Sequence, residues 1–140
     1  MSTREFYVDP SVFLLCASPG KDSELVRQNL DQSLKQGAHF FTSVLTFIQW
    51  DFIAAEAGLD QQLALSISDG FADLCSEILP FDGGHWQKAR ALRMENSISI
   101  QLAGHAAAAL EAGLMWICST SKQYRKVPGL IVVDSNFNRP

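Results

Sequence analysis

Five polar side chains stand at, or just beyond, the ends of short apolar runs that are rich in aromatic and β-branched residues. They are Asp9, Ser11, Ser43, Ser119 and Ser121. In open parallel sheets, sites form beyond the carboxyl ends of the strands, so we expect these side chains to share one edge of the molecule. Asp9 is the one charged side chain among the five.

Strand-like runs alternate with helical periodicity along the 140 residues. Runs with high β-propensity predict strands at 5–8, 39–43, 75–81, 114–119 and 129–134. Apolar residues at helical spacing predict helices at 21–37, 43–58, 60–75, 83–96 and 99–113. Strands that alternate with helices pair in parallel, with helices on both faces of the sheet. We therefore predict an α/β fold with three layers (α/β/α), a central and mostly parallel sheet of about four to five strands, and a single domain over 1–140.

Composition narrows the class of protein. No run of about eighteen apolar residues occurs, and the first residues lack the order of a signal peptide, so we expect a cytoplasmic protein without a membrane segment. The net charge of −4 disfavours a general nucleic-acid-binding surface, although a local basic patch remains compatible with it. The cysteines are odd in number and widely spaced, which favours reduced core thiols at Cys16, Cys75 and Cys118.

Four segments along almost the whole chain resemble those of the PIN domain family, especially small bacterial VapC-type toxin ribonucleases. FYVDPSVFLL resembles the opening strand, with Asp9 two residues before Ser11. SVLTFIQ is similar to Ser-x-x-Thr-x-x-Glu, with Gln49 in place of the glutamate. LAGHAAAAL is similar to Asp-Ala-x-His-x-Ala-x-Ala-Leu, with Leu102 in place of the aspartate. CSTSKQYRKVPGL is similar to Thr-x-Asp-x-x-Phe…Gly-Leu, with Ser121 in place of the aspartate.

The resemblance implies a PIN-like fold and metal-ion hydrolysis of phosphodiesters, in which clustered carboxylates hold Mg²⁺ or Mn²⁺. Of the four acids that the resemblance implies, Asp9 is the one metal ligand that remains. The other three are replaced, and Leu102 offers no ligand atom at all, so the affinity of Asp9 for the metal should be weak or lost. We predict a protein without a resident cofactor that acts by binding. Its remnant site would comprise Asp9, Ser11, Ser43, Gln49, Ser119 and Ser121. The alternative is a VapC-type ribonuclease with an altered site that still uses Mg²⁺ or Mn²⁺.

Other acids could rebuild the site only if the fold places them in it. Asp51 follows Gln49 by two residues, about 200° around a helix, and should face away from Asp9. Glu56 lies about two helical turns after Gln49 and is expected to be a surface charge. The sequence does not fix the positions of Glu95 and Asp134, which lie near loops.

His105 has two interpretations. Histidine is a common general base at neutral pH. Its neighbours, however, are small, which indicates a helix packed closely against the sheet. We therefore expect a packed, hydrogen-bonded histidine, which is also its role in the family that the chain resembles.

Two segments could serve partners. The helix at 43–58 is crowded with Phe47, Trp50, Phe52 and Ile53, which fits either self-association or deep burial. The resemblance implies a homodimer or an antitoxin-like protein partner.

The second segment, SKQYRKVPG, could bind RNA through Lys122, Arg125 and Lys126, with Tyr124 stacked on a base. Alternatively, it is a solvated loop whose Tyr124 lies in the core.

Overall fold

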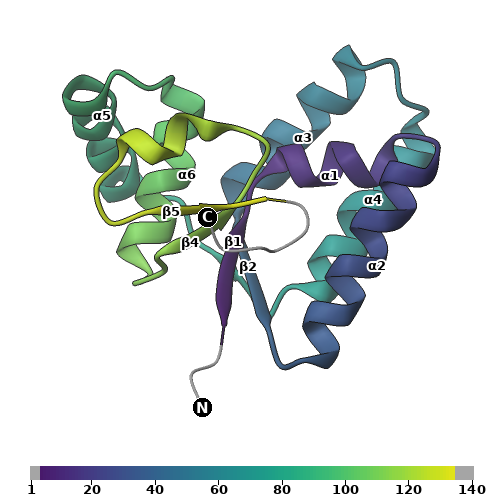
Figure 1. Ribbon diagram of the computed structural model, residues 1–140. Coiled ribbons are helices and arrows are strands. Elements are labelled where there is room, and N and C mark those ends of the chain that lie inside the picture. The colour runs from purple at the N-terminus through teal and green to yellow at the C-terminus, as the bar shows by residue number, and fades with distance from the viewer. Residues whose placement is uncertain (1–3, 135–140) are drawn as a thin grey trace.

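Residues 4–134 are described by the computed structural model, and they form one five-stranded sheet flanked by helices (Figure 1). All neighbouring strands are parallel, in the order β3-β2-β1-β4-β5. The strands are β1 (Glu5–Val8), β2 (His39–Ser43), β3 (Glu77–Leu79), β4 (Trp116–Cys118) and β5 (Ile131–Val133). The prediction of a parallel sheet within three layers is confirmed. The last three strands are shorter at both ends than predicted.

Helices cover both faces of the sheet, as Figure 1 shows. On one face lie α1 (Pro10–Ala17), α2 (Lys21–Lys35), α3 (Val44–Glu56) and α4 (Gln61–Leu74). On the other lie α5 (Gly83–Asn96) and α6 (Ile100–Glu111), with the short 3₁₀ helix η1 (Lys122–Lys126) beside them. No helix within residues 4–134 is long and apolar enough to cross a membrane.

Helix α1 was not among the predicted helices. Its sequence, PSVFLLCA, buries five of its eight residues, so it lacks the single apolar stripe by which helices are found in a sequence. Two local signals mark its start nevertheless. The Asp9 side chain caps the helix by accepting a hydrogen bond from the Ser11 backbone N–H, and Pro10 occupies the first turn. Asp9 is therefore both a residue of the predicted site and the cap of a helix.

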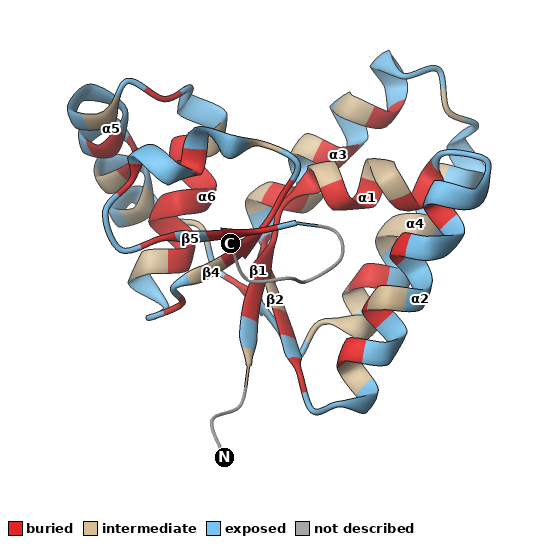
Figure 2. Cartoon of the chain, viewed as in Figure 1, coloured by how far each residue is buried: buried red, intermediate tan, exposed pale blue. Residues whose placement is uncertain are grey.

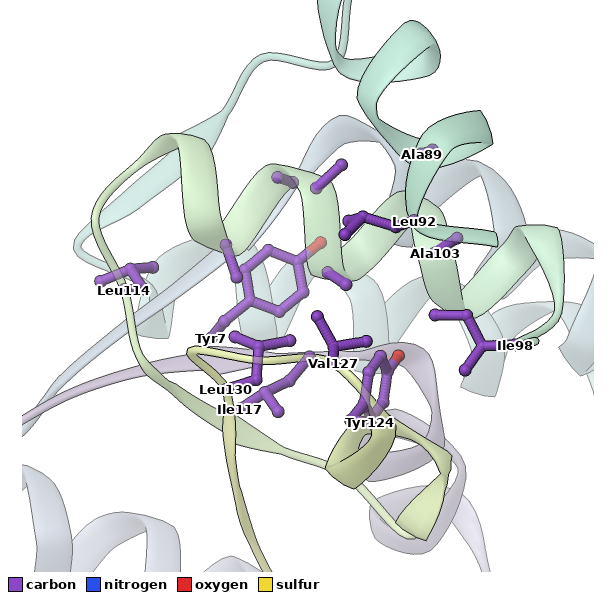
Figure 3. Packing of buried hydrophobic residues seen from close by; sticks show 14 of the residues in the cluster. Tyr7, Ala89, Leu92, Ile98, Ala103, Leu114, Ile117, Tyr124, Val127 and Leu130 are labelled. Carbon is purple, nitrogen blue, oxygen red and sulfur yellow. The ribbon is translucent and has the colours of Figure 1, made fainter. Parts of the chain in front are cut away.

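The central strand β1 divides the core into two apolar clusters. Phe6 and Val8 point to the cluster under α1, α3 and α4, whereas Tyr7 points to the cluster under α5 and α6. This alternation follows from the two-residue period of a strand. Buried positions accordingly concentrate on the sheet and on the helix faces turned toward it (Figure 2). Tyr7 and Tyr124 both lie in the second cluster (Figure 3), and neither is exposed to solvent.

Helices α3 and α6 approach each other very closely at Gly104. A β-carbon added there would lie 2.5 Å from Leu45 Cδ2 and 3.5 Å from the Phe81 ring, so only glycine fits without rearrangement. The run of small residues in α6 is almost entirely buried. The close approach brings the neighbouring His105 within hydrogen-bonding distance of β1 and α3.

Candidate functional site

Asp9 lies at the carboxyl end of β1 and is 2% exposed. Its Oδ1 accepts hydrogen bonds from the Ser11 backbone N–H at 3.0 Å and from the Ser11 hydroxyl at 2.5 Å. Its Oδ2 accepts from the Ser119 hydroxyl at 2.7 Å and from the Tyr124 hydroxyl at 2.8 Å. A carboxylate offers about four lone-pair positions. Donors of the protein itself therefore occupy the full accepting capacity of Asp9.

The loop after β4 holds two of these donors in place. The Thr120 backbone N–H donates to the Ser11 hydroxyl oxygen at 3.0 Å, and the Ser121 backbone N–H donates to the Ser119 hydroxyl oxygen at 3.0 Å. With those lone pairs engaged, the hydroxyl hydrogens are free to point at Asp9. The arrangement is a closed network that satisfies a buried carboxylate.

Tyr124 is the member of this network whose role the sequence did not reveal. Its ring is fully buried, which confirms the core alternative and excludes stacking of this ring on a base. Burial, together with the negative charge of Asp9, raises the pKa of Tyr124 well above its ordinary value. The hydroxyl therefore stays protonated at neutral pH and donates to Asp9. A phenylalanine, which the related motif has at this position, would leave that oxygen of Asp9 with one donor fewer.

A second network runs through the core to Gln49. His105 Nε2 lies 2.6 Å from Gln49 Oε1, and an amide oxygen can only accept, so Nε2 carries the ring hydrogen. His105 Nδ1 then accepts from the Tyr7 hydroxyl at 2.8 Å, and Tyr7 in turn accepts from the Ser43 hydroxyl at 2.7 Å. His105 is 1% exposed. The prediction of a packed, hydrogen-bonded histidine is confirmed, and Ser43 belongs to this core network.

Stability should fall in acid because of His105. Burial lowers the pKa of this ring from 6.5 to about 4, although the negative charge of Asp9 acts in the opposite direction. Below pH ~6.5 the unfolded chain binds a proton on His105 that the folded chain excludes. The contribution of the neutral ring to the free energy of unfolding is therefore complete above that pH and is lost as the pH falls through about 4. We expect the free energy of unfolding to drop by about 3 kcal/mol over this interval on account of His105.

Urea unfolding between pH 7 and pH 4 measures that drop. His105→Gln should remove most of the pH dependence in this range, and His39→Gln, at an exposed histidine, is the matched control. An unchanged pH profile in His105→Gln would contradict the assignment.

A cleft opens beside these networks at the carboxyl edge of the sheet. Its volume is about 590 Å³, and its walls include Pro10, Leu14, Phe52, Ile53 and Leu102. Gln49 and Ser121 also line it, as do Asp9, Ser11 and His105. The structure therefore brings five of the six predicted site residues to the cleft or to the hydrogen-bond network around Asp9, whereas Ser43 lies behind His105 in the core.

None of the four alternative acids, all of which the structure describes, joins Asp9 in the buried network. Among the residues described, Glu56 is the one of the four alternative acids that lines the cleft, where it is exposed at the rim. Its charge at the surface agrees with the expectation, but its position beside the cleft was not predicted. Asp51, Glu95 and Asp134 are exposed elsewhere.

The donor set does not fit Mg²⁺ or Mn²⁺. Such ions bind several anionic or carbonyl oxygens with free lone pairs. Here Asp9, the one acid in the buried network, is fully hydrogen bonded. Gln49 Oε1 and Ser121 Oγ are neutral, and each already accepts one hydrogen bond, from His105 and from the Gln123 backbone N–H at 3.3 Å. Over residues 4–134, no three His, Cys, Asp or Glu side chains come together in a group that could hold a metal ion.

The remaining predicted residues lie outside the cleft. Lys122, Arg125 and Lys126 are exposed along η1, and Lys126 Nζ donates to the Ser97 carbonyl at 3.4 Å. Cys16, Cys75 and Cys118 are free thiols, as predicted. Burial raises the pKa of Cys16 to about 11 and that of Cys75 to about 12, so neither is a reactive thiolate.

The fold is that of PIN-domain toxins of the VapC type, as the sequence predicted. No family model and no curated protein matches the chain. Solved structures do match. VapBC2 from Rickettsia felis bound to a promoter DNA fragment has a TM-score of 0.71 at 14% identity, over 93% of this chain and 98% of that one. The sarcin-ricin-loop-cleaving toxin VapC20 from Mycobacterium tuberculosis has a TM-score of 0.71 at 13% identity, over 96% of this chain and 99% of that one. A toxin-antitoxin complex from Klebsiella pneumoniae has a TM-score of 0.61 at 18% identity, over 96% of this chain and 98% of that one.

Proposed function

We propose that this PIN-like domain lacks metal-dependent nuclease activity and acts by binding a protein partner. The observation that carries the proposal is that the buried carboxylate of Asp9 is fully hydrogen bonded by the protein itself. Its four hydrogen bonds come from Ser11, Ser119 and Tyr124, so the one acid retained from the related motif serves the fold. A carboxylate that needs no counter-ion is suited to a domain that stays permanently without metal.

An antitoxin-like protein or a second copy of the chain is the partner that we propose. The similar structure from Klebsiella pneumoniae is a toxin-antitoxin complex, and another, from Mycobacterium tuberculosis, is a member of the VapBC family of toxin-antitoxin systems. These neighbours support a protein partner for this fold. Helix α3 also carries an apolar stripe at Val44, Ile48 and Phe52, which are 43%, 54% and 71% exposed. These residues are spaced by four and share one helix face. Trp50, by contrast, is fully buried and belongs to the core.

Divalent metal should leave the thermal unfolding midpoint unchanged, within about 1 °C, at millimolar Mn²⁺ or Mg²⁺. A ligand that binds the folded state raises the midpoint by mass action, so the absence of a shift reports the absence of a site. The same titration on Asp9→Asn is the control. A rise in the parent protein that disappears in Asp9→Asn would instead establish the altered ribonuclease, the alternative function, and would call for an RNA cleavage assay.

Ile48→Lys should abolish self-association if the α3 stripe joins two copies. A lysine on a desolvated apolar face is costly, so we expect analytical ultracentrifugation to show a dimer in the parent and a monomer in the variant. Leu65→Lys, at a comparably exposed position on α4, is the matched control and should keep the mass of the parent. A parent that is monomeric at high micromolar concentration would leave an antitoxin-like partner as the occupant of the stripe.

RNA is a second candidate partner because Lys122, Arg125 and Lys126 are all exposed on one short helix. Such binding would weaken steeply with salt and on charge reversal at Arg125 and Lys126.

A further inference from the structure

The cleft differs from an acidic metal site in its chemistry as well as in its missing acids. Among the residues described, its lining holds no lysine or arginine, and Asp9, the buried acid in it, has no free lone pair. Most of its wall is aliphatic or aromatic, from Leu14, Phe52, Ile53 and Leu102. Its volume of about 590 Å³ falls in the range of small-molecule sites, roughly 300–1,000 Å³. The polar residues of the lining determine which head group a ligand must carry.

Two half-buried side chains of the lining, Gln49 and Ser121, carry hydrogen-bond donors. Gln49 lines the cleft, and its Oε1 accepts a hydrogen bond from His105 Nε2, which holds the side-chain amide in place. The amide NH₂ of Gln49 is therefore left as a donor for a ligand. Ser121 Oγ accepts from the Gln123 backbone N–H, so its own hydrogen can donate into the cleft. Both donors are neutral, and both call for an acceptor.

We propose that the cleft binds an uncharged small molecule with an apolar body and a carbonyl-type acceptor that receives hydrogen bonds from Gln49 and Ser121. This inference rests on the proposed loss of metal chemistry, and it names the ligand class of the same site. An anionic head group would find no cation in the described lining. A cationic head group would meet two donors at the polar end. Glu56 is exposed to water, where a single charge contributes little attraction.

Three probes that share one ring separate these possibilities. Cyclohexanecarboxamide is neutral, cyclohexanecarboxylate is anionic, and cyclohexylmethylamine is cationic at neutral pH. Each is titrated into the ¹⁵N-labelled protein, and the Gln49 side-chain NH₂ and the cleft backbone amides are followed by NMR. We expect the carboxamide to shift these signals and to bind about tenfold more tightly than either charged probe, because only it satisfies the donors without burying a charge.

Variants test the role of Gln49 itself. Gln49→Glu replaces the donor by a carboxylate and should reverse the preference toward the amine. Gln101→Glu adds the same charge at another, exposed residue of the lining and should leave the carboxamide preferred. Phe52→Ser removes an apolar wall at an exposed position and should weaken all three probes without loss of folding.

The outcomes separate this proposal from the proposed function. If a charged probe binds as tightly as the carboxamide, or if no probe shifts the Gln49 amide, the ligand assignment is wrong, and an unchanged midpoint in Mn²⁺ leaves the loss of metal chemistry standing. If Mn²⁺ raises the midpoint, the proposed function is wrong whichever probe binds.

Discussion

Asp9→Asn is expected to lower the free energy of unfolding by about 3 kcal/mol, in the absence of any metal. Asparagine retains one accepting oxygen but presents an NH₂ group where Asp9 now accepts two hydrogen bonds. One pair of donors, on Ser11 or on Ser119 and Tyr124, would then face another donor. Hydrogen bonds to a charged group contribute about 1.5–3 kcal/mol, and a buried donor left unpaired costs a comparable amount. Chemical denaturation in the presence of EDTA measures the change.

Two controls make the sign of that result informative. Tyr124→Phe removes one of the four donors and should cost less, about 1–2 kcal/mol. Asp51→Asn changes an exposed carboxylate on α3 and should cost almost nothing. If Asp9→Asn were instead more stable than the parent, the carboxylate of Asp9 would be destabilised by repulsion from other acids. Such repulsion is expected in a working cluster of metal-binding carboxylates, so this outcome would contradict the proposed function.

Local signals were sufficient to predict most of the fold. The helical periodicity and the short β-rich runs predicted five helices and five strands within a few residues of their observed bounds, because these helices carry apolar residues at helical spacing and the strands are short runs of high β-propensity. Helix α1 escaped detection since it is apolar nearly all round. The ends of β3, β4 and β5 were placed too far out because pairing, rather than β-propensity, decides where a strand stops.

The chemistry of the site was harder to predict because it depends on contacts between distant residues. Tyr124 donates to a carboxylate 115 positions earlier in the chain, and His105 contacts a tyrosine 98 positions earlier. The motif indicated that acids were missing, but not that Asp9 had acquired replacement partners. Tyrosine in place of phenylalanine was the available signal. Both alternatives that the sequence offers for Tyr124, a base-stacking ring and a core ring, concern its ring and leave its hydroxyl unexplained.

Returning the three missing acids should not by itself restore tight metal binding. Gln49→Glu, Leu102→Asp and Ser121→Asp together put carboxylates at the positions where the related motif has them. In this triple variant the Tyr124 hydroxyl still occupies Asp9 Oδ2. We expect calorimetric titration to show weak Mn²⁺ binding to the triple variant, and about tenfold tighter binding once Tyr124→Phe is added, since the ion no longer displaces a hydrogen bond to a charged group.

Tyr124→Phe in the parent protein is the control, and it should bind no Mn²⁺ because a single carboxylate does not suffice for a hard divalent cation. Equal affinity of the triple and quadruple variants would mean that the ion does not compete with Tyr124, and that the missing acids alone explain the loss of metal binding. The two variants differ by one oxygen atom, 2.8 Å from Asp9 Oδ2 and buried in the core. A difference in their affinities therefore reports the competition between that hydroxyl and the metal for the same carboxylate oxygen.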